Sequence, residues 1–173
     1  MSIKTIPGGK LSECAYVRGV LACKQRVHKY MRRSIRKPRI MLLSGGIEYT
    51  RTENRIASFD TLLEAEEKYM EILVDKIAML TPDVLIVGRA VSRQAQELLE
   101  KRGIVLLQHV KLELMQRIAR QTGAKILSST DHVMNQFGKS VLGECERFRL
   151  LTFRDHECDV QRKSAFRDQM GQW

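Results

Sequence analysis

The sequence predicts an α/β fold built around a βαβαβ core. Three short apolar runs, at residues 84–87, 104–107 and 125–127, alternate with two amphipathic segments. Runs rich in Val, Ile and Leu are typical of strands that are covered on both faces. The intervening segments have the spacing of helices with one apolar side. A mainly parallel sheet with two crossover helices is therefore expected.

Both amphipathic segments carry signals for the ends of helices. Ser92 is placed to cap the first helix, and Gly103 and Gly123 follow the two helices, where a left-handed residue is favoured. The apolar residues at helical spacing are Val91, Ala95, Leu98 and Leu99 in the first segment, and Leu112, Met115, Ile118 and Ala119 in the second.

The chain ahead of this core predicts two further strands. Residues 1–14 form an entry loop or hinge around Pro7-Gly8-Gly9, and a first strand is expected at 15–23, weakened internally by Gly19. Residues 39–43 form a second, buried strand. The Gly45-Gly46 pair then turns the chain into an extended segment at 47–50.

Between these strands, Val27, Met31 and Ile35 recur every four residues. This spacing indicates a short helix or helical turn with its apolar side inward. Pro38 would end it, because the residue before a proline is disfavoured in a helix.

The longest helix is expected from Asp60, a plausible N-cap, to Leu80, ended by Pro82. Its main face is predicted to contain Leu62, Ala65, Tyr69, Ile72, Leu73, Lys76, Ile77 and Leu80. A second apolar flank is formed by Leu63, Met70, Val74 and Met79. This width indicates either deep burial or a binding surface, and an apolar stripe is more often core than site.

After the core, residues 128–139 read as a loop and 145–153 alternate as a further strand. The charged segment 154–173 lacks periodicity and is predicted to be a loose tail. The predicted folded domain is therefore 15–153, which suits a 173-residue chain that is 43% apolar. No apolar run approaches the ~20 residues of a membrane span. Four widely spaced cysteines favour a reducing, cytoplasmic setting.

The net charge of +10 is concentrated in one stretch. Residues 24–39 contain no acidic residue and eight basic ones: Lys24, Arg26, Lys29, Arg32, Arg33, Arg36, Lys37 and Arg39. Such a stretch is a candidate anion-binding site for a membrane surface or, less favoured, nucleic acid. The alternative is a solvated face laid over Glu64, Glu66, Glu67 and Glu71.

The motifs of known catalytic chemistry are missing from the sequence. There is no glycine-rich phosphate loop, dinucleotide fingerprint or kinase catalytic loop. His156, Glu157 and Cys158, with Cys145 upstream, lack the paired spacing of a zinc site. We therefore expect no catalytic residues, no metal and no cofactor in this chain.

Several segments resemble the apical domain of group II chaperonin subunits. They are Gly19-Val20, Lys29-Tyr30-Met31, Pro38 to Leu43, Ile47-Glu48-Tyr49, Pro82-Asp83-Val84, Val91-Ser92, Ala95-Gln96, Arg117 to Arg120 and Thr122-Gly123-Ala124. The chain is more similar to the chaperonin-like domain of phosphatidylinositol 3-phosphate 5-kinases, the PIKfyve family. The residues that favour this family are Ser58 to Leu63, Ser92 to Gln96, Leu142-Gly143, Cys145 and Phe148. The connection from Tyr49 to Glu66 is also short, where chaperonins carry a helical protrusion.

The resemblance implies a three-layer β/β/α apical fold and a non-catalytic protein-interaction domain. Its partners would be the scaffold and the phosphatase of the kinase complex, on endosomal membranes. Two alternatives are the substrate-binding apical domain of a group II chaperonin and a basic module that binds anionic lipid or nucleic acid. In chaperonins the groove for partners lies between two helices, which here correspond to residues 60–80 and 92–102. The predicted partner-binding residues are Leu63, Met70, Val74, Arg93, Gln96 and Glu97.

Overall fold

The computed structural model describes residues 3, 5, 14–48, 59–129 and 141–151, and within 59–65 it describes the backbone only. The chain divides into two compact units, residues 1–18 with 151–173, and residues 19–150. The fold described below is that of the second unit. The predicted boundaries at residues 15 and 153 remain predictions, and the predicted tail lies outside the described residues.

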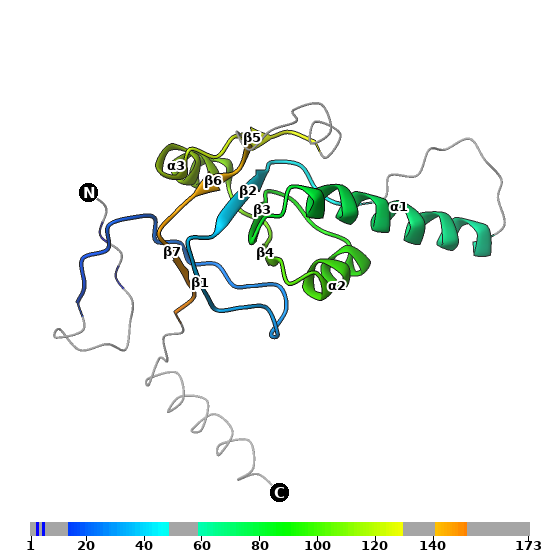
Figure 1. Cartoon of the computed structure of the whole chain (residues 1–173), viewed down its shortest axis with the longest axis horizontal. Coiled ribbons are helices and arrows are strands. Elements are labelled where there is room, and N and C mark those ends of the chain that lie inside the picture. Colours follow the sequence, from blue (N-terminus) through cyan, green and yellow to red (C-terminus); the bar gives the residue numbers. More distant parts are fainter. Residues whose placement is uncertain (1–2, 4, 6–13, 49–58, 130–140, 152–173) are drawn as a thin grey trace, which may run out of the picture. The chain divides into compact units, whose positions relative to one another are not determined.

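A mixed sheet forms the centre of this unit (Figure 1). Its parallel strands are β2 (Arg39–Leu43), β3 (Val84–Val87), β4 (Val105–Leu107) and β5 (Ile126–Leu127), in the order β4-β3-β2-β5. The short strand β6 (Gly143–Glu144) pairs antiparallel with the start of β2. β2 and β3 coincide with predicted runs, and β4 and β5 each begin one residue later than predicted.

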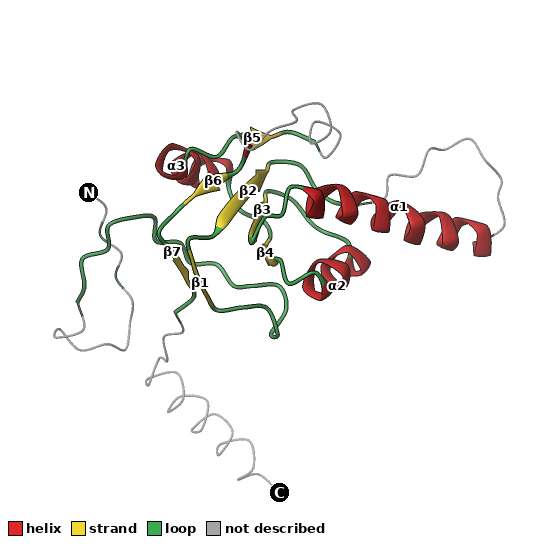
Figure 2. Ribbon diagram, viewed as in Figure 1, coloured by secondary structure: helices red, strands yellow, loops and turns green. Residues whose placement is uncertain are grey.

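Three helices connect and cover the strands (Figure 2). They are α1 (Phe59–Met79), α2 (Arg93–Lys101) and α3 (Leu112–Thr122). α1 and α2 cross between neighbouring strands in the same direction, whereas α3 returns across the sheet to β5. Right-handed crossovers therefore place α1 and α2 on one face and α3 on the other. This arrangement confirms the predicted α/β fold with a βαβαβ core.

The core lies on both faces of the sheet. All four residues of β3 and all three of β4 are buried. α1 contributes Met70, Leu73, Val74 and Ile77, α2 contributes Ala95 and Leu99, and α3 contributes Met115. The continuous apolar runs of the sequence are thus explained by burial of the strands on both sides.

The helix-end signals read from the sequence are confirmed with one exception. Ser92 is the N-cap of α2, and its side chain accepts a hydrogen bond from the backbone N–H of Ala95. Gly123 ends α3 with a φ of 74°, and Gly103 follows α2 with a φ of 72°. Asp60, however, lies within α1, which already begins at Phe59.

The predicted first strand is wrong. Residues 15–23 form no strand in the described chain, and Tyr16, Val17 and Leu21 are exposed. The first strand is instead β1 (Ser34–Arg36), which pairs antiparallel with β7 (Arg147–Arg149) in a separate two-stranded ribbon. Apolar residues at 15–23 satisfied the strand pattern, but none of the described strands pairs with them.

Two other local predictions are only partly correct. A turn is present where the backbone N–H of Met31 donates to the carbonyl of His28, but Ile35 belongs to β1 rather than to a helix. Ile47 forms a single bridge with Val91 instead of a strand, and residues 49–50 lie outside the described chain. The strand predicted at 145–153 is realised as β7 alone, and 152–153 are not described.

Candidate functional site

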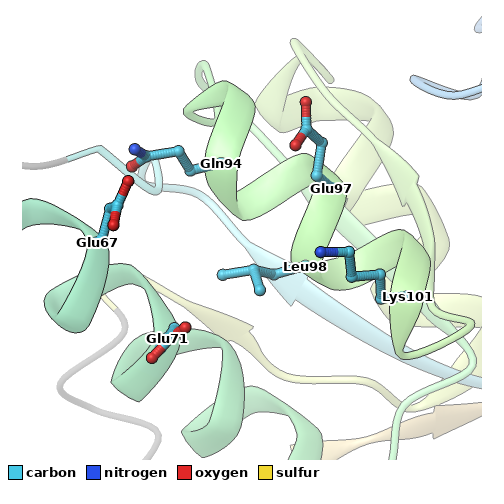
Figure 3. A pocket seen from close by; sticks show the side chains of 6 residues that line it. All are labelled: Glu67, Glu71, Gln94, Glu97, Leu98 and Lys101. Carbon is cyan, nitrogen blue, oxygen red and sulfur yellow. The ribbon is translucent and has the colours of Figure 1, made fainter.

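A shallow cleft lies between α1 and α2, on the side of the helices away from the sheet (Figure 3). Its lining residues are Glu67 and Glu71 from α1 and Gln94, Glu97, Leu98 and Lys101 from α2. The cavity volume of about 140 Å³ is below the ~300–1,000 Å³ typical of small-molecule sites. The cleft therefore fits a side chain or a short segment of another protein better than a cofactor.

The spacing of these residues follows from helix geometry. Glu67 and Glu71 are one turn apart on α1, and Gln94, Leu98 and Lys101 form the matching row on α2. Both helices run in the same direction, so the two rows face each other along their length. Gln94 and Glu67 point toward one another across one end of the cleft (Figure 3).

Two contacts hold the helices together beside the cleft. The Ser92 hydroxyl donates a hydrogen bond to the sulfur of Met70 at 3.4 Å. Further along, the guanidinium of Arg102, just after α2, forms an ion pair with the carboxylate of Asp75 on α1. The cleft is therefore framed by a half-buried contact and a surface contact between its two walls.

The cleft offers mainly hydrogen-bond acceptors. Three carboxylates face one ammonium group, and the Oε1 atom of Gln94 is buried with no hydrogen-bond partner among the described residues. Leu98 supplies the apolar part of the lining. This arrangement is complementary to a partner segment that carries lysine, arginine or amide donors beside an apolar side chain.

The structure places the partner-binding residues predicted on α1 in the core rather than in the cleft, where their side chains are described. Met70 and Val74 are buried in the core, as the favoured interpretation of the second apolar flank predicts, so neither side chain is available for the direct partner contact also predicted for it. The apolar stripe of α1 is rotated relative to the prediction, and Tyr69 and Ile72 of the predicted buried face are exposed. The side chain of Leu63 lies outside the described part of the structure.

The three polar residues predicted on α2 also differ in their contacts. Arg93 and Glu97 form an exposed ion pair with a distance of 3.2 Å between Nε and Oε1. Gln96 donates to the backbone carbonyl of Val91 at 2.7 Å and to the side-chain Oε1 of Gln108 at 3.4 Å, so its amide group is engaged within the domain. Of the three, Glu97 alone lines the cleft.

The basic segment 24–39 is partly engaged within the domain. Lys24 donates to the carbonyl of His109 at 2.6 Å, and Arg26 donates to the carbonyl of Met31. Arg32 donates to the carbonyl of Gly103 at 2.9 Å and pairs with Asp83 at 3.4 Å. The ammonium of Lys29 lies 4.9 Å from the centre of the Tyr30 ring.

The partners of this segment are not the predicted ones. No ion pair joins it to Glu66, Glu67 or Glu71 in the described chain, and the side chain of Glu64 is not described. Asp83, at the start of β3, is the carboxylate that it contacts most. The remaining residues, Arg33, Arg36 and Lys37, lie on or beside β1.

The carboxyl edge of the sheet, where open α/β sheets usually bind ligands, is closely packed. The backbone N–H and hydroxyl of Ser44 both donate to the carbonyl of Leu127, at 2.8 and 3.1 Å. A Cβ atom at Gly45 would lie 2.6 Å from the carbonyl oxygen of Ser128. The loops after β2 and β5 therefore contact each other directly.

The described residues contain no candidate metal centre and no candidate membrane span. No group of three or more His, Cys, Asp or Glu side chains in the described ranges is arranged to hold a metal ion. Within the same ranges, no helix is long and apolar enough to cross a membrane. His156, Glu157 and Cys158 lie outside the described chain.

Sequence comparison relates the chain to two groups of proteins. A model of the TCP-1/cpn60 chaperonin family matches residues 1–163. The 1-phosphatidylinositol-3-phosphate 5-kinase FAB1A of Arabidopsis thaliana is 39% identical over 168 residues, or 95% of this chain and 9% of that protein. The T-complex protein 1 subunit gamma of Dictyostelium discoideum is 37% identical over 138 residues, or 76% of this chain and 26% of that protein.

A further kinase and a solved chaperonin structure are similar to the chain as well. The human 1-phosphatidylinositol 3-phosphate 5-kinase is 34% identical over 88% of this chain and 7% of its own length. The chain thus spans about a tenth or less of these kinases. A group II chaperonin monomer from Methanococcoides burtonii, solved in its open state, has the same fold, with a TM-score of 0.69 at 22% identity over 87% of this chain and 32% of that one.

Proposed function

Since the chain belongs to the TCP-1/cpn60 chaperonin family, we propose that it is the chaperonin-like domain of a 1-phosphatidylinositol-3-phosphate 5-kinase and that it binds protein partners. The observation that carries this proposal is the 39% identity to FAB1A across 95% of the chain. The gamma subunit of the chaperonin matches a smaller share of the chain, 76%. The chain itself would perform no chemistry.

The α1–α2 cleft is the proposed partner surface. Its acidic walls and the unpartnered oxygen of Gln94 suit a donor-rich segment. The partners would be the scaffold and the phosphatase of the kinase complex, on endosomal membranes. Met70 and Val74 would act indirectly, by fixing α1 against the sheet.

Co-purification from the full-length kinase tests the surface. Glu67→Lys with Glu71→Lys reverses the charge of one cleft wall, and both side chains are exposed. We expect this variant to retain less than a tenth of the scaffold and phosphatase, since like charges across an interface cost several kcal/mol. The matched control is Glu113→Lys with Glu144→Lys, which makes the same charge change at exposed positions on α3 and β6.

The control should keep normal amounts of both partners, and the lipid kinase activity of both variants should be measurable. If the cleft variant retains both partners at the level of the control, the cleft is not the partner surface. The isolated 173-residue chain should neither hydrolyse ATP nor phosphorylate phosphatidylinositol 3-phosphate.

A second candidate function is the substrate-binding apical domain of a group II chaperonin. The 37% identity to a T-complex gamma subunit favours it. The two candidates differ in the native protein. A kinase would phosphorylate phosphatidylinositol 3-phosphate after immunoprecipitation, whereas a chaperonin subunit would be recovered in a large ring that hydrolyses ATP.

A further inference from the structure

The β1–β7 ribbon brings together arginines from two distant parts of the chain. Ser34, Ile35 and Arg36 pair with Arg149, Phe148 and Arg147, respectively. Ile35 is buried and Phe148 is half-buried against the core. Because successive side chains of a strand alternate between faces, Arg36, Arg147 and Arg149 share the opposite, exposed face.

These three arginines differ from most of the basic segment 24–39 in the partners of their side chains. Lys24, Arg26 and Arg32 are engaged with backbone carbonyls and Asp83. By contrast, Arg36, Arg147 and Arg149 have no side-chain hydrogen bond or ion pair with any residue that the structure describes. The ribbon therefore presents positive charge that this part of the domain leaves uncompensated.

The pairing register of β1 and β7 places like charges next to each other, which is unfavourable in the absence of a ligand. Arg36 and Arg147 stand directly opposite each other, and like charges at such positions destabilise a strand pair. A phosphate group between the two guanidinium groups would reverse the sign of this interaction, since arginine binds phosphate with two parallel hydrogen bonds. The geometry is that of a site completed by an anion.

The adjacent turn favours a membrane as the source of the phosphate. Four residues before β1, Tyr30 is 71% exposed, with the Lys29 ammonium over its ring. Tyrosine and lysine at an exposed turn suit the boundary between headgroups and acyl chains, where an apolar body and a polar tip are both accommodated. Arg33 and Lys37, both exposed, extend the basic surface on either side of Ser34 and Arg36.

We infer that the exposed face of the β1–β7 ribbon, with Arg36, Arg147 and Arg149, binds the phosphates of anionic phospholipid headgroups on a membrane. This surface uses other residues than the α1–α2 cleft and does not depend on the proposed protein-binding role. The inference also narrows the candidate anion-binding site from the whole stretch 24–39 to the part that forms the ribbon, and adds Arg147 and Arg149 from β7.

Vesicle co-sedimentation of the full 173-residue chain tests the inference. The probes are phosphatidylcholine vesicles with and without added phosphatidylserine and phosphatidylinositol 3-phosphate. The ribbon variant is Arg36→Gln, Arg147→Gln and Arg149→Gln. The control variant is Lys68→Gln, Lys111→Gln and Arg117→Gln, which removes the same charge from exposed positions on α1, on α3 and just before α3.

We expect the chain to bind the anionic vesicles, and the binding to weaken as salt is raised. The ribbon variant should bind roughly 100-fold more weakly, because each basic residue near an anionic surface contributes roughly a factor of five. The control variant should bind nearly as well as the unchanged chain. Single Arg36→Gln and Arg147→Gln variants should each lose roughly five-fold, which keeps the test valid if the triple variant fails to fold.

Other outcomes would overturn the inference. Equal weakening of the ribbon and control variants would show attraction by net charge alone. Binding to duplex RNA or DNA without binding to anionic vesicles at low salt would assign the ribbon to nucleic acid. Complete displacement from vesicles by soluble inositol phosphate, with equal affinity for both, would assign it to a free phosphate rather than to a membrane surface.

Discussion

The hydroxyl of Ser92 donates a hydrogen bond to the sulfur of Met70 at 3.4 Å and accepts one from the backbone N–H of Ala95 at 3.3 Å. One side chain thus caps α2 and contacts the buried face of α1. Sulfur is a weak acceptor, so most of the stabilisation at this point comes from the packing of Met70, which has no exposed surface. This pair is one of the contacts between the two helices that form the cleft walls.

Met70→Ala should lower the free energy of unfolding by about 2–5 kcal/mol, because it removes buried atoms and leaves a cavity. Ser92→Ala should cost about 1 kcal/mol through loss of the cap. Urea unfolding followed by circular dichroism measures both. Ile72→Ala, at a position that is 55% exposed, is the matched control and should cost less than about 0.5 kcal/mol. Equal costs for Met70→Ala and Ile72→Ala would contradict the burial of Met70.

The parallel strands β2 to β5 and the ends of α2 and α3 were predictable because local signals determine them. Residues 40–43 of β2 and all of β3 are continuous apolar runs that are buried, and this pattern is visible in the sequence. α1 was predicted as a helix, but its buried face was not. Apolar residues surround much of this helix, so periodicity allowed more than one stripe, and contacts with the sheet and α2 selected Met70, Leu73, Val74 and Ile77.

The sites were harder to predict because they depend on residues that are distant in sequence. The row Gln94, Leu98 and Lys101 and the pair Glu67 and Glu71 have the spacing of helix faces, which was a usable signal. Nothing local, however, shows that the two rows face each other. In the same way, no pattern near Arg36 indicates its pairing with Arg147, which is 111 residues away along the chain.

Gly88 should be intolerant of any side chain. A Cβ atom there would lie 2.6 Å from the carbonyl oxygen of Ser44, which belongs to the closely packed loop after β2. Gly88→Ala should therefore cost about 1–3 kcal/mol, as other overpacked substitutions do. Gly103→Ala, where a Cβ would meet no atom within 4 Å but φ is 72°, should cost about 1 kcal/mol. Thermal unfolding of both variants compares the steric cost at Gly88 with the conformational cost at Gly103. A smaller loss of stability in Gly88→Ala than in Gly103→Ala would contradict the close approach of Gly88 to Ser44.

Cys145 should react slowly with alkylating reagents. Burial raises the pKa of its thiol, and a backbone hydrogen bond from Arg147 opposes that rise. Because the thiolate is the reactive form, iodoacetamide at mildly alkaline pH should label Cys145 more slowly than the exposed Cys23. Peptide mass spectrometry gives the two rates, and urea should equalise them. Faster labelling of Cys145 in the folded chain would contradict its burial.

The raised pKa of the Cys145 thiol also determines the direction in which stability changes with pH. The folded chain holds the Cys145 proton more tightly than the unfolded chain does. Its stabilising contribution is therefore present below the usual thiol pKa and is lost as the pH rises through the folded value. The free energy of unfolding should fall between neutral and alkaline pH by a smaller amount in Cys145→Ser than in the unchanged chain. An identical fall in both would show that the thiol contributes nothing.

Asp83 is expected to stabilise the domain more than the ion pair beside the cleft does. Its carboxylate accepts a hydrogen bond from the backbone N–H of Arg39 at 3.0 Å and pairs with Arg32 at 3.4 Å, and its side chain is 27% exposed. Asp75, which pairs with Arg102, is 50% exposed. Asp83→Ala should cost about 1–3 kcal/mol because it removes a hydrogen bond from the Arg39 backbone N–H to a charged carboxylate.

Asp75→Ala should cost less than about 1 kcal/mol, and high salt should remove most of that cost, since exposed ion pairs are weak and screened. Urea unfolding of both variants at low and high salt separates the two cases. The cost of Asp83→Ala should persist at high salt, because a hydrogen bond to the backbone is screened less than the attraction between exposed charges. If both costs vanish together at high salt, Asp83 acts only through its charge, and its bond to Arg39 contributes little to the junction of β2 and β3.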